Sequence, residues 1–372
     1  MSGTSNLSQK RLEITDGSFG WVRPNTWSLD THIVNGALGF DRTTVIEPDT
    51  MIAGQDFVVP GAVLHGTIHA NGGTFSEVTL GLNNQGTVRA SDGVELLIGP
   101  SFNFETPHQA GRLVGGTWVV DSGATMRFRY QSDPDVRANR LAANVTVRDP
   151  GSTLPILNNL QTIESDGAFH LENGASFTTN GWLAVEVFGS LHVVGGGEFH
   201  GRNLHVRENG MLTLDNESTV ELTESFSMAP DTTLQYLIVG KELRSTLFQT
   251  DQWTVLDGVL RVQFANPGQW LGRPIELVSA AVVQGRFQTT ELLNAGFDLE
   301  LTYTPTNVTL KLVPTPSSIG VLALPCASMP RRRRPRSVPL TPQSARSLQV
   351  TSAHSLQATS PTPAACEKRR AR

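Results

Sequence analysis

Cysteine is almost absent from this chain of 372 residues, since Cys326 and Cys366, both close to the C-terminus, are its only two. The rest of the sequence therefore holds no disulfide and no thiolate metal site, and its folding does not depend on oxidation. Charged residues make up 17% of the sequence and aromatic residues 7%, whereas glycine occurs 35 times. This balance is typical of turn-rich β structure.

Motifs for catalysis and cofactor binding are also missing. We find no Gly-x-Ser-x-Gly elbow, no phosphate-binding glycine-rich loop and no calcium nonapeptide repeat, and we interpret Gly195-Gly196-Gly197 as a corner. Residues 1–20 lack the basic region and apolar run of a secretory signal peptide. We therefore expect a protein that is not an enzyme, binds no cofactor and no metal, and does not bind nucleic acid.

What the sequence does contain is a repeat of 21 or 22 residues. Gly167, Gly189 and Gly210 recur at these intervals, and each opens a segment of alternating apolar and polar residues, the pattern of a half-buried strand. Three series of apolar residues keep this period: Phe169/Leu171, Leu191/Val193 and Leu212/Leu214; then Phe177, Phe199 and Val220; and finally Leu183/Val185, Leu204/Val206 and Phe226/Met228. Each repeat thus contains three short strands.

This period predicts an all-β fold, a right-handed parallel β-helix with rungs of about 20–22 residues. A single rung buries too few side chains to offset its ordering cost, so such units are stable only when stacked. Pairs such as Asp166-Gly167, Asn173-Gly174 and Gly195-Gly196 separate the strands, and they tolerate the positive φ of tight corners. Earlier in the chain, Gly66-Thr67-Ile68 and Gly86-Thr87-Val88 recur after 20 residues, as do Val78 and Ile98.

We divide the chain into four regions. Residues 1–60 are interpreted as an N-terminal β cap, in which Trp21, Trp27 and Phe40 are available to cover the first open end. Residues 61–229 form the parallel β-helix, although the register is lost around 100–143, and residues 130–140 are expected to form a loop or a short helix. Residues 230–313 contain longer strands that we expect to be antiparallel, and residues 314–372 form a tail.

The C-terminal region resembles a known class of proteins. The motifs that carry this resemblance occupy residues 255–260, 275–278, 285–287, 301–303 and 308–310. Their succession is similar to the closing region of bacterial exported β-helix surface proteins, which include autotransporter passengers and planctomycete-type surface proteins. Residues 313–318, the apolar run 319–324 and the arginines 331–334 resemble a degenerate Pro-Glu-Pro-type C-terminal sorting signal, in which Thr315 replaces the glutamate.

The resemblance implies export and a location at the cell surface or outside the cell, with transient membrane contact through the degenerate signal. The expected partners are extracellular polysaccharide or other envelope components. The tail contains 10 of the 29 basic residues and one of the 34 acidic ones, so it carries +9 and the body −14. We expect this tail to be disordered. A frame change near Leu324 would explain its composition. The missing signal peptide indicates either a true start upstream or a degenerate gene product.

Five polar residues are candidates for an exposed surface ladder: His170, His192, Glu186, Arg202 and Arg207. His170 and His192 occupy equivalent positions on neighbouring rungs, with Thr213 next in line, and a zinc site would need more ligands than these. Two functions follow. The first is a non-enzymatic structural or adhesion-type surface protein of a bacterium. The alternative is a polysaccharide lyase or glycoside hydrolase on a β-helix scaffold, with a groove through Glu186, Arg202 and Arg207.

Overall fold

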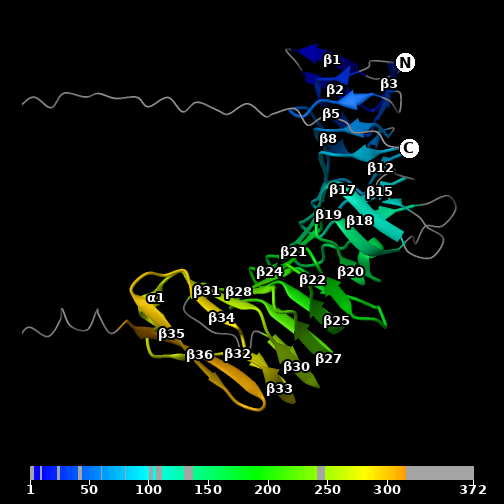
Figure 1. The fold of residues 1–372 in the computed structure, drawn as a ribbon. Coiled ribbons are helices and arrows are strands. Elements are labelled where there is room, and N and C mark those ends of the chain that lie inside the picture. Colours follow the sequence, from blue (N-terminus) through cyan, green and yellow to red (C-terminus); the bar gives the residue numbers. More distant parts are fainter. Residues whose placement is uncertain are drawn as a thin grey trace, which may run out of the picture. The chain divides into compact units, whose positions relative to one another are not determined.

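The structure is a computed structural model that describes residues 4–8, 11–22, 26–40, 44–59, 61–79, 81–99, 104–105, 111–129, 137–240 and 248–315. These residues form an all-β fold with sheets of 26, 6 and 4 strands (Figure 1). The helices within the described ranges are the 3-10 helix η1 (Pro155–Leu157) and α1 (Pro267–Trp270). The largest sheet is mostly parallel, which is compatible with the predicted parallel β-helix.

One series of parallel strands, the first ladder, runs through the described chain from β2 to β34. Each member pairs in parallel with the next: β2 (Arg11–Thr15), β5 (Asp30–Val34), β8 (Met51–Gln55), β11 (Thr67–Asn71), β14 (Thr87–Ser91), β17 (Gly111–Val120), β19 (Ala138–Arg148), β21 (Ala168–Glu172), β24 (Ser190–Val194), β26 (Met211–Asp215), β28 (Thr233–Ile238), β31 (Val259–Phe264) and β34 (Thr289–Leu292).

Two further series run beside it. The second ladder comprises the six-stranded sheet β3 (Ser18–Val22), β6 (Ala37–Phe40), β9 (Val58–Val59), β12 (Phe75–Val78), β15 (Glu95–Ile98) and β18 (Thr125–Phe128), and later β22 (Ser176–Thr178), β25 (Glu198–Val206), β27 (Thr219–Met228), β29 (Phe248–Thr250) and β32 (Pro274–Ser279). The third ladder comprises the four-stranded sheet β4 (Thr26–Trp27), β7 (Val45–Ile46), β10 (Val63–Leu64) and β13 (Asn83–Asn84), and later β20 (Thr162–Ile163), β23 (Val185–Val187), the C-terminal parts of β25 and β27, β30 (Trp253–Leu256) and β33 (Val282–Gly285).

The register of the first two predicted series is confirmed. Leu171 lies opposite Val193, and Val193 lies opposite Leu214. In the second ladder Phe177, Phe199 and Val220 lie opposite one another in turn, and the series continues to Phe248. The 20-residue period in the earlier part is confirmed by the pairs Ile68 with Val88 and Val78 with Ile98.

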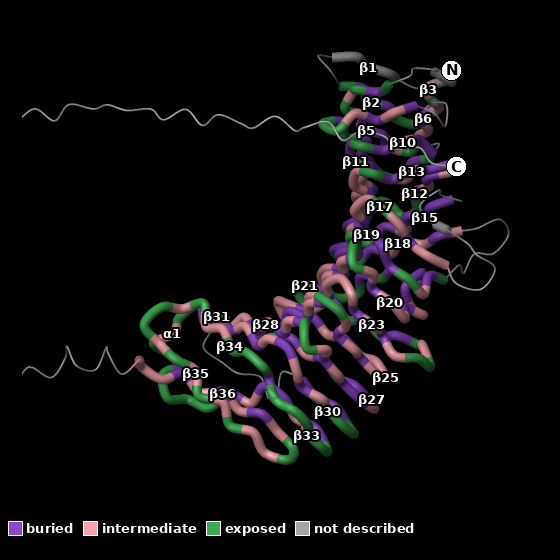
Figure 2. The backbone as a smooth tube through the Cα atoms, viewed as in Figure 1, coloured by how far each residue is buried: buried purple, intermediate pink, exposed green. Residues whose placement is uncertain are grey.

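The core is built from these stacked apolar positions. Figure 2 shows buried and less buried residues alternating along the strands, and the burial pattern of β21 and β24 is the same in both. Phe169, Leu171, Leu191 and Val193 are all inaccessible to solvent. Because like side chains lie above like, each repeat covers the apolar surface of its neighbour.

Two different structural requirements explain why glycine recurs at these positions. Asn173 and Gly174 have φ of 56° and 80°, so this corner requires the left-handed region, as predicted. Gly189, in contrast, is required by crowding, because a Cβ atom there would lie 2.1 Å from the backbone oxygens of Glu164 and Gly167. Gly167 is crowded in the same way, since a Cβ atom there would lie 2.3 Å from Leu141 O, so positive φ was the wrong explanation for Asp166-Gly167.

Parallel pairing also extends through the region interpreted as an N-terminal cap. Strands β2, β5 and β8 pair in parallel with one another and with β11 across residue 60. Trp27 is buried in β4, and its Nε1 donates to Leu29 O at 2.9 Å. The side chains of Trp21 and Phe40 lie outside what the structure describes. At this end β1 (Thr4–Ser8) pairs antiparallel with β2.

Residues 100–143, where the sequence pattern is lost, keep the same pairing with longer intervals. Val88 of β14 lies opposite Trp118, and Trp118 lies opposite Val145. The extra residues include the short strand β16 (Phe104–Glu105), which pairs antiparallel with β17. Residues 130–136 of the predicted loop or short helix lie outside the described ranges, while residues 138–140 belong to β19.

The third predicted series is correct between Leu204 and Phe226 but wrong before it. Leu204 lies opposite Val185, and Val206 lies opposite Val187, so the strand is shifted by two residues from the predicted pairing with Leu183. A shift of two keeps every side chain on its own face of the strand, and the apolar pattern therefore fits both registers. Leu183 lies outside the core with 61% of its surface exposed.

The antiparallel prediction for residues 230–313 is correct only at its end. β30 and β31 are two strands that pair in parallel with β27 and β28, so the parallel arrangement continues across residue 230. Antiparallel pairing begins where β36 (Asn307–Pro314) joins both β32 and β35 (Phe297–Tyr303). The sorting signal beyond Thr315, the disordered tail and the proposed frame change after Leu324 all concern residues outside the described ranges.

Candidate functional site

His170 and His192 lie opposite each other on β21 and β24, as predicted, and Thr213 follows on β26. Their imidazole rings stack, with centroids 4.4 Å apart and planes within 6° of parallel. Burial lowers the pKa of His170, and burial together with the charge of His170 lowers the pKa of His192 to about 4. Both rings are therefore neutral at neutral pH, so that stacking them brings no two positive charges together.

This pair predicts that stability falls in mild acid. The pKa of His192 is about 4 in the folded state and 6.5 ordinarily, so the unfolded state binds more protons between these values. The contribution of His192 to the free energy of unfolding is therefore fully present above pH 6.5 and is lost as the pH falls towards 4. After allowance for solvent screening we expect His192 to account for about 2 kcal/mol. Urea denaturation between pH 4.5 and 7.5 measures this effect.

The matched variants for that measurement are His192→Gln and His65→Gln, since His65 is an exposed histidine outside the stack. We expect His192→Gln to flatten the pH dependence of the unfolding free energy and His65→Gln to leave it unchanged. Equal pH profiles for His192→Gln and the unmodified protein would contradict the assignment.

The other three predicted surface residues do not join the histidines. Glu186 of β23 and Arg207, which follows β25, form an ion pair of 3.3 Å on the third ladder. Arg202 of β25 lies opposite a bulge in β27 and pairs with Glu224 of that bulge. The five residues therefore form three separate groups, since Arg202 belongs to a different ion pair from Glu186 and Arg207.

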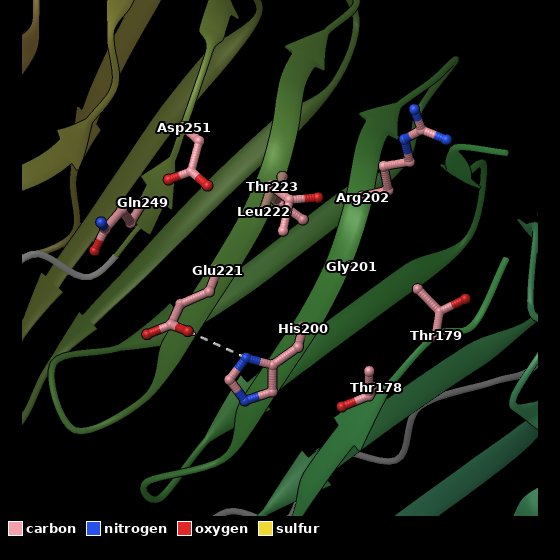
Figure 3. A pocket seen from close by; sticks show the side chains of 10 residues that line it. All are labelled: Thr178, Thr179, His200, Gly201, Arg202, Glu221, Leu222, Thr223, Gln249 and Asp251. Atoms are coloured by element: carbon pink, nitrogen blue, oxygen red, sulfur yellow. Dashed lines mark ion pairs between the residues drawn. The ribbon is translucent and has the colours of Figure 1, made fainter. Parts of the chain in front are cut away.

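A hollow of about 390 Å³ lies on the outer side of the second ladder, where β25 changes register between Gly201 and Asn203 (Figure 3). Its walls come from the end of β22, from β25 and β27, and from β29 and the residue after it. The lining residues are Thr178, Thr179, His200, Gly201, Arg202, Glu221, Leu222, Thr223, Gln249 and Asp251. At this register shift Thr223 and Glu224 of β27 face the single residue Arg202 of β25, so β27 carries a bulge beside the hollow.

His200 lies between two carboxylates in this hollow. Its Nδ1 is 3.2 Å from Glu221 of the next strand, and its Nε2 is 3.6 Å from Glu198 of its own strand. Figure 3 shows the Glu221 carboxylate directed towards the imidazole, with Asp251 on the neighbouring segment. Each ring nitrogen of His200 therefore faces a carboxylate oxygen.

Arg202 is held at the edge of the hollow by a local network. Glu224 accepts hydrogen bonds from Asn203 Nδ2 at 2.7 Å and from the Arg202 guanidinium, and these bonds lower the pKa of Glu224 in that order. The Arg202 guanidinium also lies over the ring of Trp182, 5.8 Å from its centroid. This network fixes the position of a cation whose charge is balanced by Glu224.

Sequence reasoning found only Arg202 among the lining residues and missed His200, Glu221 and Asp251 as members of a site. A signal was present, because Thr178, His200 and Glu221 recur at 22 and 21 residues beside the predicted apolar series. The bulge that opens the hollow has no such signal.

A second polar group lies on the first ladder, upstream of the histidine stack. Arg89 Nη2 lies 2.7 Å from Asp121, which is almost fully buried, and His69 Nε2 lies 2.9 Å from Ser91 Oγ. Burial, followed by the charge of Arg89, lowers the pKa of His69. These contacts link neighbouring strands, although Arg89 Nε and Asp121 Oδ1 are buried without a hydrogen-bond partner, and we assign the group a structural role.

Within the described ranges, no three or more histidine, cysteine or carboxylate side chains are grouped so that they could hold a metal ion. In the same part of the chain, none of the helices has the length and apolar character needed to cross a membrane. No protein-family model matches the chain, and a search of curated protein sequences found no significant match.

Proposed function

We propose that this chain is a right-handed parallel β-helix with rungs of about 20–22 residues and that it is a non-enzymatic surface protein of a bacterium, with a structural or adhesive role. The observation that carries the proposal is the uninterrupted parallel pairing of the first ladder from β2 to β34. A coil of this kind presents a long outer surface on a scaffold in which each repeat supports the next. Its ligands are extracellular polysaccharide or other envelope components.

Ion pairs link neighbouring strands on the outer surface, and they support a role in which this surface binds a partner. Arg127 pairs with Glu95, Arg148 with Glu172, and Arg261 with Glu291, each across adjacent strands of one ladder. Each exposed pair contributes little by itself, on the order of 0.2–1 kcal/mol. Their arrangement instead fixes the positions of long side chains on a surface that a partner can recognise.

Localisation of the tagged full-length product, expressed with its upstream reading frame, tests this proposal. We expect the tag to be accessible to an antibody or a protease on intact cells. A product confined to the cell interior under those conditions would contradict the surface role.

The alternative is a polysaccharide lyase or glycoside hydrolase, and the observation that favours it is the hollow with His200, Glu221 and Asp251. Glycosidases use two carboxyl groups on either side of the scissile bond, and histidine is a common general base. Incubation of the purified protein with acidic and neutral polysaccharides tests this alternative. Release of unsaturated or reducing sugars that is lost in Glu221→Gln would favour the enzyme over the binding protein.

A further inference from the structure

Trp182 is the most exposed large apolar side chain in the part of the chain that the structure describes, with 85% of its surface accessible. It lies next to the hollow of the second ladder, because the Arg202 guanidinium that lines the hollow also lies over its ring. The turn that carries it is tied to the same site, since Gly181 N–H donates to Thr179 Oγ1 at 3.3 Å. An indole this exposed at the edge of a hollow is a platform on which a flat apolar ligand face can stack.

The hollow supplies hydrogen-bonding groups beside that platform. Apart from Gly201 and Leu222, each of its lining residues carries a hydroxyl, amide, carboxylate, imidazole or guanidinium group. At about 390 Å³ it is within the usual size range of small-molecule sites. Sugar rings present an apolar face and a rim of hydroxyl groups, and this combination matches an aromatic platform next to a polar hollow.

The charge around the hollow selects among polysaccharides. Glu221 and Asp251 line it, Glu198 lies against His200, and Glu224 balances Arg202. The carboxylates therefore exceed the single guanidinium, and residues 1–313 carry a net charge of −14. A uronate would bring a like charge into this acidic hollow, whereas hydroxyl groups can donate to the carboxylates without a charge penalty.

We propose that Trp182 and the hollow lined by His200, Glu221 and Asp251 form a binding site for an uncharged polysaccharide. One sugar ring stacks on the indole, and the hydroxyl groups of its neighbour donate to the carboxylates of the hollow. This inference rests on the adhesive role proposed above, for which it names the ligand class. It also separates this site from acidic glycans, which are among the substrates tested for the alternative enzymatic function.

Affinity gel electrophoresis of the full-length protein tests the proposal with four soluble probes: hydroxyethyl cellulose, galactomannan, polygalacturonate and chitosan. We expect at least one of the two uncharged probes to retard the protein, with an affinity that 0.5 M NaCl leaves unchanged, since no charge pair is formed. Trp182→Ala is expected to lower that affinity at least about tenfold. Phe75→Ala is the matched control, because Phe75 is an exposed aromatic residue of β12 outside the hollow, and it should bind as the unmodified protein does.

A second variant, Glu221→Gln, keeps the shape of the hollow and removes one charge. It should weaken binding of the uncharged probe, because one carboxylate that accepts from the sugar hydroxyls is lost, and it should raise the affinity for polygalacturonate. Retardation by polygalacturonate or chitosan alone would overturn the ligand class, and undiminished binding by Trp182→Ala would overturn the site. No retardation by either uncharged probe would overturn this inference while leaving the surface role intact, because that role is decided by the localisation experiment.

Discussion

Replacement of Gly189 by alanine is expected to lower the free energy of unfolding by at least about 4 kcal/mol. The new Cβ would lie 2.1 Å from the carbonyl oxygens of Glu164 and Gly167, which belong to the backbone of the preceding repeat. Gly167 O also accepts the hydrogen bond from Ser190 N–H at 3.1 Å. The two repeats would therefore have to separate, and the pairing of β21 with β24 would be strained along with them. Urea denaturation followed by circular dichroism measures the effect.

Gly268→Ala is the matched control for that experiment. Gly268 lies in α1, where a Cβ would meet nothing within 4 Å, and alanine is favoured over glycine in helices by about 1 kcal/mol. We expect this variant to be as stable as the unmodified protein or slightly more stable. If Gly189→Ala unfolded at the same urea concentration as Gly268→Ala, the close approach of the two repeats would be wrong.

The second large effect is expected for Trp118→Ala, at about 4 kcal/mol. Trp118 is fully buried in β17 and packs against Phe128 with ring centroids 5.1 Å apart. Its Nε1 donates to Gly115 O at 3.0 Å, so the substitution removes a hydrogen bond as well as the largest side chain at this level of the core. Val88 and Val145 lie opposite it on the two adjacent strands and would face the cavity.

Trp182→Ala is the matched control for the free energy of unfolding, because it removes the same kind of side chain from an exposed position. We expect its free energy of unfolding to stay within about 0.5 kcal/mol of the unmodified protein. Similar losses for the two tryptophan variants would show that Trp118 does not occupy the core. The result matters because Trp118 lies in the region where the sequence period is lost.

The central repeats could be predicted from the sequence because parallel pairing without shifts places like residues opposite like. The contacts of Leu171, Val193 and Leu214 follow from their spacing alone, and no long-range information is needed. The same logic failed for Leu183, since alternation fixes which face a side chain takes but not which of two registers the strand adopts. Burial distinguishes the two registers, because Val185 and Val187 lie in the core whereas Leu183 is exposed.

Strand direction was the second property that the pattern did not contain. β30 and β31 alternate as antiparallel strands would, yet they continue the parallel ladders, because alternation is the same in both arrangements. The corner between them lies at Gly258, which has φ of 66°. Direction depends on where the chain returns, and that is set by contacts distant in sequence.

The candidate site was predicted least well. His200 and Glu221 stand at repeat positions, so their proximity could have been derived from the 21-residue interval between them. The hollow itself lies at the bulge in β27, and Gln249 and Asp251 reach it only after a longer interval, which no local pattern indicated. The candidate site lies where the repeat is interrupted, and a period-based prediction is weakest at such points.

The antiparallel hairpins at the two ends of the described sheet, β1 with β2 and β35 with β36, also bear on how molecules of this protein meet. A second copy adding to β1 or to β35 in the manner of an internal repeat would encounter a strand running in the opposite direction. Asp298, exposed on β35, would in addition bring negative charge to such a contact. Parallel addition of a second copy to these two edge strands is thereby disfavoured.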